Sequence, residues 1–243
     1  QGKAGVSEET AQRIAAAIQQ LGYAPRQPSV RRTNGRKAQS KLFGLLLEEM
    51  SLSAFPETVY GAIIKAIETE AKQAGYSMVL SIIEQDAVPQ LVVDEQVSGV
   101  IILGGCPLND AVALRLVAQN IPLLLLDTYL VGAPIDAIVP DNEWGGYQAI
   151  QHLAALGHRR IGIIEGPAKY RTLTDRLWGA LRAAHDLGLA IPAAYRPAPQ
   201  SSGHPWKGYR EMKTLLALDQ PPTAVFAISD KTAFGALEAL REA

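Results

Sequence analysis

The chain has 243 residues, a formal net charge of -1, 48% hydrophobic residues and one cysteine. Its ordinary apolar content, with 19% charged residues, excludes wholesale disorder, and the densest apolar run, Ile121 to Leu126, is far shorter than the ~20 residues of a membrane helix. The lone Cys106 excludes an internal disulfide and a multi-thiolate metal site, and because no apolar run follows Lys3 we expect no secretory signal.

The near-neutral total hides a division of charge. Residues 1–47 hold eight Lys and Arg against two Asp and Glu, a net +6, and the remaining residues carry -7. Between Thr10 and Leu47 there are seven cations and no acid. Such a segment is either a solvated connector or a contact for a polyanion, and the complete lack of acids favours contact with phosphates.

The first 40 residues predict a helix and a linker. Ser7 is a suitable N-cap, and an apolar stripe runs from Ile14 to Leu21. This stripe is too small to form a core by itself. Residues 25–40 are mostly Pro, Gly, Asn, Ser, Arg and Lys, a composition typical of a linker.

Strand and helix patterns alternate through the rest of the chain. Short apolar runs typical of buried strands occur at Phe43–Leu47, Met78–Ile83, Val100–Leu103, Leu123–Leu126, Ile161–Ile164 and Ala224–Ile228. Helical patterns occur at Glu57–Ala74, Asp110–Asn120, Trp144–Leu156, Thr172–Leu187, Trp206–Ala217 and Thr232–Glu242. This alternation predicts an α/β fold with parallel sheets. A further strand would normally follow the last helix, so we expect a chain truncated at its C-terminus.

Motifs of common catalytic and cofactor sites are missing. The sequence contains no Gly-x-Gly-x-x-Gly, no P-loop and no Gly-x-Ser-x-Gly elbow. Its four histidines have no metal-ligand spacing, and His158 lies where a basic residue favours the end of a helix. We therefore predict no catalytic residue, no metal and no cofactor.

Several motifs follow one another in a recognisable order. They include Leu21-Gly-Tyr-Ala-Pro25, Val139-Pro-Asp-Asn142, His152-Leu-Ala-Ala-Leu-Gly-His-Arg-Arg-Ile161, Arg176-Leu-Trp-Gly179 and Pro222-Thr-Ala-Val-Phe-Ala-Ile-Ser-Asp230. Together they closely resemble the LacI/GalR family of bacterial transcription regulators, whose core has a type I periplasmic-binding-protein fold. The resemblance covers nearly the whole chain.

The resemblance implies a two-lobed core of parallel sheets flanked by helices, preceded by a remnant of a helical DNA-binding headpiece. The expected divisions are the last headpiece helix at 1–25, a basic hinge at 26–40, an N-terminal lobe at 41–141 and an incomplete C-terminal lobe at 142–243. Departures from the family are also expected. We expect the recognition helix to be missing before Gln1, and Arg32 stands where the hinge leucine would enter the minor groove. The segment 84–96 is shorter than usual, which predicts a trimmed helix, and Ser229 stands where the family commonly has asparagine.

Site residues follow from the same resemblance. Arg176 matches an arginine that grips the ligand, and Asp127 matches an acceptor for its hydroxyls; their alternatives are a helix-surface arginine and a carboxylate that caps a turn. For Asp230 the alternative to ligand binding is to cap the last helix, and for Phe55 it is to pack within the lobe. The predicted effector-binding residues are Phe55, Asp127, Arg176, Trp206, Ser229 and Asp230, and the predicted DNA-binding residues are Arg26, Arg31 and Arg32.

These features predict a cytoplasmic, homodimeric repressor with no membrane contact. Its core would bind a small metabolite, a sugar or related polyol, and so modulate its affinity for operator DNA. One alternative is a stand-alone solute-binding protein without a DNA role. Another is a sugar-processing α/β enzyme, which would need a base or nucleophile that the motifs do not supply.

Overall fold

The computed structural model describes residues 41–48, 59–83, 87–93, 97–104, 107–199 and 205–243. From Ser40 onward the chain is one compact unit. The predicted first helix and the basic linker lie outside the described residues.

Five parallel strands form the first sheet. They are β1 (Leu42–Glu48), β2 (Ser77–Ile83), β3 (Val100–Leu103), β4 (Leu123–Leu126) and β5 (Asp136–Ile138). Their order is β2-β1-β3-β4-β5, and every pairing is parallel. The order reverses at β1, from which the chain proceeds first to one side and then to the other, as in doubly wound folds.

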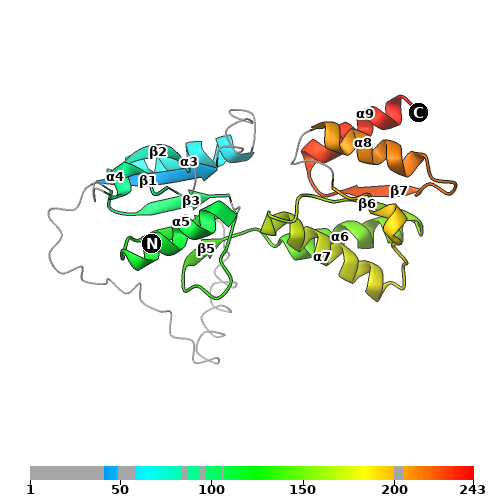
Figure 1. Cartoon of the computed structure of the whole chain (residues 1–243), viewed down its shortest axis with the longest axis horizontal. Coiled ribbons are helices and arrows are strands. Elements are labelled where there is room, and N and C mark those ends of the chain that lie inside the picture. The colour runs from blue at the N-terminus through cyan, green and yellow to red at the C-terminus, as the bar shows by residue number, and fades with distance from the viewer. Residues whose placement is uncertain (1–40, 49–58, 84–86, 94–96, 105–106, 200–204) are drawn as a thin grey trace, which may run out of the picture. The chain divides into compact units, whose positions relative to one another are not determined.

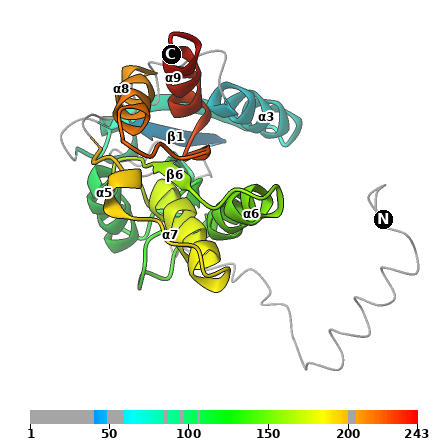
Figure 2. The ribbon, with the colours of Figure 1, turned by 90° about the vertical axis from the view of Figure 1, so that its right-hand side faces the viewer.

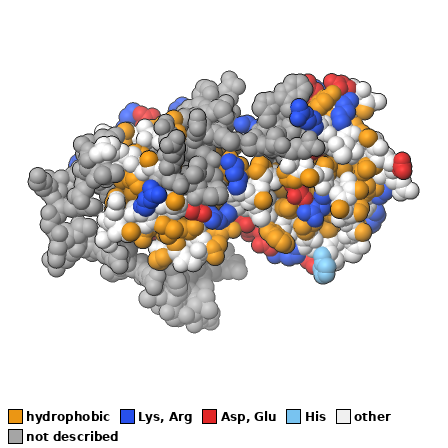
Figure 3. Space-filling model, viewed as in Figure 1, with side chains coloured by type: hydrophobic (Ala, Val, Ile, Leu, Met, Phe, Trp, Pro, Cys, Tyr) orange, Lys and Arg blue, Asp and Glu red, His pale blue; other side chains and the backbone are white. Residues whose placement is uncertain are grey.

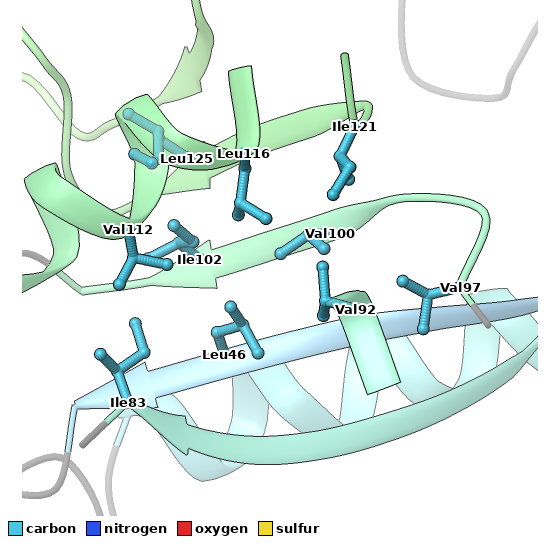
Figure 4. Close-up of a cluster of buried hydrophobic side chains, with 11 residues drawn as sticks. Leu46, Ile83, Val92, Val97, Val100, Ile102, Val112, Leu116, Ile121 and Leu125 are labelled. Atoms are coloured by element: carbon cyan, nitrogen blue, oxygen red, sulfur yellow. The ribbon is translucent and has the colours of Figure 1, made fainter. Parts of the chain in front are cut away.

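Helices cover both faces of this sheet, and the alternation of side chains along β1 explains why. Leu45 and Leu47 belong to the cluster that packs on α3 (Val59–Gln73). Leu46, between them, points to the opposite face. There it joins the cluster formed with α4 (Gln90–Val93) and α5 (Pro107–Ala118) (Figure 4). The strand is therefore apolar at consecutive positions because both faces are buried.

The second sheet has two parallel strands, β6 (Ile161–Ile164) and β7 (Ala224–Ala227). Figures 1 and 2 show two helix pairs on its opposite faces. One pair is α6 (Asn142–Ala155) and α7 (Arg171–Asp186), which pack on Ile161 and Ile163; the other is α8 (Pro205–Leu216) and α9 (Asp230–Arg241), which pack on Ile164. A 3₁₀ turn, Ala193–Tyr195, lies between α7 and α8.

The predicted α/β class with parallel sheets is confirmed. β3, β4 and β6 have the predicted bounds, and the predicted helices differ from the observed ones by a few residues. Three elements were missed: α4, which has four residues, the 3₁₀ turn Ala193–Tyr195, and β5, which has three residues that are all exposed and so lacks an apolar run. The short α4 agrees with the unusually short segment expected at 84–96.

Residues 139–141 link the part of the chain that contains the first sheet to the part that contains the second. We call residues 42–138, which form the five-stranded sheet and its helices, the first half, and residues 142–241 the second half. The lobe boundaries proposed above stay a prediction. On the face seen in Figure 3, acidic and basic side chains are interspersed among apolar ones.

Candidate functional site

Ligands of parallel α/β folds bind at the carboxyl ends of strands, where loops converge and backbone groups are free. These ends lead into Asp127 after β4, Glu165 after β6 and Ile228 after β7. The loop after β1 contains Phe55, which lies outside the described residues. Three strand ends therefore supply the candidate residues that can be placed.

Asp127 leaves β4 in a left-handed backbone conformation, with φ of 56°. Aspartate tolerates this region better than most residues, and such positions are enriched at functional sites. Its backbone N–H donates to Ile138 O at 2.9 Å, which ties the turn to β5. The Tyr60 hydroxyl, on α3, donates to Asp127 Oδ2 at 2.7 Å. Because a helix orients this carboxylate, the contact favours an acceptor held for a ligand over a simple turn cap.

Arg176 lies in the second turn of α7 and reaches the end of β7. Its Nε donates to Asn142 Oδ1 at 2.8 Å, and one terminal nitrogen donates to Ile228 O at 3.1 Å. Asn142 is itself buried, and its amide donates to Pro140 O at 3.2 Å. A guanidinium has five N–H donors, and these two bonds orient it while they use only two. The Arg176 side chain therefore points to the end of the sheet, which favours the ligand role over that of a helix-surface arginine.

A close crossing of α6 and α7 holds Arg176 in place. A Cβ on Gly146 would lie 1.9 Å from Arg176 O, and one on Gly179 would lie 1.8 Å from Glu143 O. Real Cβ atoms do not approach a carbonyl oxygen so closely, so only glycine fits at either position. The two backbones therefore touch where α7 carries Arg176 and where α6 begins.

Ser229 and Asp230 begin α9 beside the carbonyl that Arg176 contacts. Ser229 is the N-cap, and its Oγ accepts from Thr232 N at 3.5 Å. The alternative role of Asp230, as the cap of this helix, is wrong: Asp230 is the first helical residue, where its charge suits the positive end of the helix dipole. Arg176 and Ser229 are thus neighbours through Ile228, whereas Asp127 belongs to the other sheet.

The remaining predicted residues cannot be placed against these. Trp206 is the second residue of α8. Phe55 and the predicted DNA contacts Arg26, Arg31 and Arg32 lie outside the described residues.

A four-residue cluster that sequence reasoning missed connects the two halves. One terminal nitrogen of Arg171 donates to Asp110 Oδ1 at 2.8 Å, and the other donates to Asp110 Oδ2 at 2.5 Å. Arg171 also donates to Tyr129 O at 3.1 Å, and the Tyr129 hydroxyl donates to Asp175 Oδ1 at 2.9 Å. The partners are 42 to 61 residues apart in sequence, so no local pattern indicates them.

The environment of this cluster keeps its donors protonated. The hydrogen bond to Asp110 is the main cause that raises the pKa of Arg171, against the opposing effect of burial. Burial raises the pKa of Tyr129, and the hydrogen bond to Asp175 raises it further. The phenol therefore remains a donor, and the guanidinium remains charged, at neutral pH.

The described residues contain neither a cluster suited to a metal ion nor a helix suited to a membrane. No three histidine, cysteine, aspartate or glutamate side chains there are grouped closely enough to hold a metal ion. Within the same residues, none of the helices combines the length and the apolar character needed to cross a bilayer.

Two parallel α/β sheets with polar groups at the carboxyl ends of their strands define a ligand-binding core of the periplasmic-binding-protein type. Residues 40–243 match the family described as periplasmic binding proteins and sugar binding domain of the LacI family. The chain therefore belongs to the LacI family of transcription regulators, and residues 40–243 form its effector core.

Individual relatives agree with this assignment. The HTH-type transcriptional repressor PurR of Escherichia coli O139:H28 is 31% identical over 243 residues, which cover 98% of this chain and 68% of that protein. The transcriptional regulator CelR, solved with cellobiose, is 26% identical, with a TM-score of 0.75 over 99% of this chain and 71% of CelR. A LacI-family regulatory protein from Chloroflexus aggregans is 24% identical and shares the fold, with a TM-score of 0.71 over 84% of this chain and 73% of that one.

Proposed function

We propose that this chain is part of a cytoplasmic, effector-responsive repressor that binds operator DNA as a homodimer. A small metabolite, a sugar, binds its core and changes its affinity for DNA. Residues 1–25 and the basic residues 26–40 make the DNA contacts, with Arg26, Arg31 and Arg32 on phosphates. The protein is not an enzyme. PurR, which carries the word repressor in its name, supports the regulatory role.

The observation that carries the proposal is the orientation of Arg176. Asn142 and Ile228 O hold its guanidinium at the end of β7, and donors remain for a ligand oxygen. Asp127, held by Tyr60, is a matching acceptor for a hydroxyl. One rigid donor fork and one oriented carboxylate suit a polyol better than an apolar ligand. The CelR structure contains cellobiose, which supports the choice of a sugar.

Ligand binding is tested by thermal shift with cellobiose, ribose and adenosine as probes. A sugar that binds only the folded state raises the melting temperature by mass action. A shift with adenosine but with neither sugar would support the effector site and overturn the sugar assignment. No shift with any probe, at concentrations that saturate CelR with cellobiose, would contradict the sugar assignment as well.

DNA binding separates the regulator from a stand-alone solute-binding protein, which the family description also includes. Fluorescence anisotropy with a random-sequence duplex measures this directly. The proposal predicts binding at low salt that weakens steeply as salt rises, because cations on phosphates release counterions. Negligible, salt-independent binding would favour the solute-binding protein. Sugar turnover that is lost in Asp127→Asn would instead indicate an enzyme.

A further inference from the structure

The cluster of Asp110, Tyr129, Arg171 and Asp175 joins the first half of the chain to the second. Asp110 lies in the first turn of α5 and Tyr129 follows β4, so both belong to the first half. Arg171 and Asp175 lie in the first two turns of α7, in the second half. Because they are four residues apart on a helix, they share one face. Each of the two sides therefore supplies one acid and one donor group.

The contacts are stronger than those of an ordinary surface ion pair. Arg171 meets Asp110 with two parallel N–H···O bonds, the arrangement that gives arginine its geometric specificity for carboxylates. The side chains of Arg171 and Asp110 are 30% and 24% exposed. Partial burial reduces screening by solvent and salt, which normally makes surface pairs weak. The Arg171 guanidinium also lies 6.0 Å from the centre of the Tyr129 ring.

The positions of these residues in the chain connect the cluster to the candidate ligand site. Asp175 directly precedes Arg176, and Tyr129 is two residues after Asp127. The hydrogen bond between Tyr129 and Asp175 thus constrains the segments that carry the two candidate ligand groups. Among the described residues, this bond and the one from Arg171 to Tyr129 O both hold the segment of Asp127 against α7, which carries Arg176.

We propose that Asp110, Tyr129, Arg171 and Asp175 are positioning residues that form a bridge between the two halves and thereby set the affinity for the effector. The effect on affinity rests on the function proposed above; the bridge itself does not. In the bridged state the donor fork and the acceptor are in place before the ligand arrives. Breaking the bridge lowers the population of this binding-competent state, and the observed affinity falls with it.

The bridge is tested without a ligand by pulsed electron resonance on the full chain. In a Cys106→Ser background, nitroxide labels at Lys65→Cys on α3 and Glu238→Cys on α9 occupy exposed positions, one in each half. Excess unlabelled protein suppresses distances between molecules. Asp110→Asn should add a population at new distances, and Arg171→Lys, which keeps the charge but loses the fork, should give a smaller change. Since the two variants act on the same pair, Arg171→Lys decides the question if Asp110→Asn fails to fold.

Arg182→Gln is the matched control. Arg182 forms an ion pair with Glu143, and both residues lie within the second half, on α7 and α6. Its distance distribution should match the parent. If Asp110→Asn and Arg171→Lys also matched the parent, the bridge would be refuted.

Affinity for cellobiose, measured by calorimetry, gives the second readout. Loss of a bridge of this kind should weaken binding of cellobiose by about five- to thirty-fold in Asp110→Asn. The circular dichroism spectrum should be unchanged, and Arg182→Gln should bind as the parent does. Unchanged cellobiose affinity in Asp110→Asn would overturn the role in binding. Should the parent bind neither cellobiose nor ribose, the sugar assignment fails, and the distance measurement still decides whether the bridge exists.

Discussion

The two halves of the chain bury their sheets by different means. In the first half, consecutive apolar side chains on β1 fill both faces of a five-stranded sheet. In the second half only two strands are present among the described residues, and helices pack backbone to backbone at Gly146, Gly179 and Gly208. The first half therefore depends on side-chain volume, and the second on the absence of side chains at three glycines in two helix crossings, α6 with α7 and α8 with α9.

This difference affects the two candidate ligand groups. Asp127 follows a strand and is oriented by one hydrogen bond from Tyr60. Arg176 lies on a helix whose backbone touches Gly146, so its position depends on the helix crossing. Changes to the crossing should therefore disturb Arg176 first, whereas changes to α3 should disturb Asp127.

The largest expected effect comes from placing a side chain at the close crossing of α6 and α7. Gly179→Leu places a side chain 1.8 Å from Glu143 O, which forces α6 and α7 apart. We expect a loss of about 4 kcal/mol or more in the free energy of unfolding, measured with urea. Gly145→Ala is the control, because a Cβ there has no neighbour within 4 Å. It should gain about 0.5–1 kcal/mol from helix propensity; equal losses in both variants would contradict the account of the crossing.

A cavity in the first half should lower the free energy of unfolding by a slightly smaller amount. Leu46 is 1% exposed and packs in the cluster between the sheet and α5 (Figure 4). Leu46→Ala should lower the free energy of unfolding by about 2–5 kcal/mol, because it removes buried methyl groups and leaves a cavity. Urea denaturation measures this loss in the free energy of unfolding. A loss below 1 kcal/mol would show that this sheet face is not tightly packed.

Removal of the hydroxyl that orients Asp127 should have a smaller effect. Tyr60→Phe deletes the 2.7 Å bond to Asp127 Oδ2 and keeps the ring in its cluster. We expect a loss of about 1 kcal/mol in the free energy of unfolding. Binding of cellobiose should also weaken, because the carboxylate loses its orientation. Unchanged affinity would remove Asp127 from the site.

The smallest effect is a pH dependence at the end of α9. Hydrogen bonds from Tyr209 and then from Lys213 lower the pKa of Glu242 below its ordinary value of 4.5. A lowered pKa in the folded state stabilises the protein above pH 4.5, and this contribution is lost as the pH falls towards the folded-state pKa. The melting temperature of the parent should therefore lie slightly above that of Glu242→Gln at pH 6, and this difference should shrink as the pH falls from 4.5 to 3. A difference that grew over this range would contradict the sign.

Much of the fold could be predicted from the sequence because buried strands have continuous apolar runs. Leu123–Leu126 and Ile161–Ile164 begin and end where predicted, whereas the exposed strand Asp136–Ile138 carries no such signal. The resemblance indicated Arg176 and Asp127, but not what orients them. Asn142, Tyr60 and the bridge residues act through contacts 34 to 67 residues apart, which periodicity does not encode.

The central claim is that Arg176 grips the effector of a sugar-responsive regulator. Its most direct test is the thermal shift with cellobiose and ribose on the parent, Arg176→Ala and the control Arg182→Ala, which changes another arginine of α7. At a hundred times the dissociation constant, a ligand adds about 2.7 kcal/mol, or roughly 5–10 °C. We expect a sugar to produce this shift in the parent and in Arg182→Ala and to lose it in Arg176→Ala. The full shift in Arg176→Ala would contradict the account.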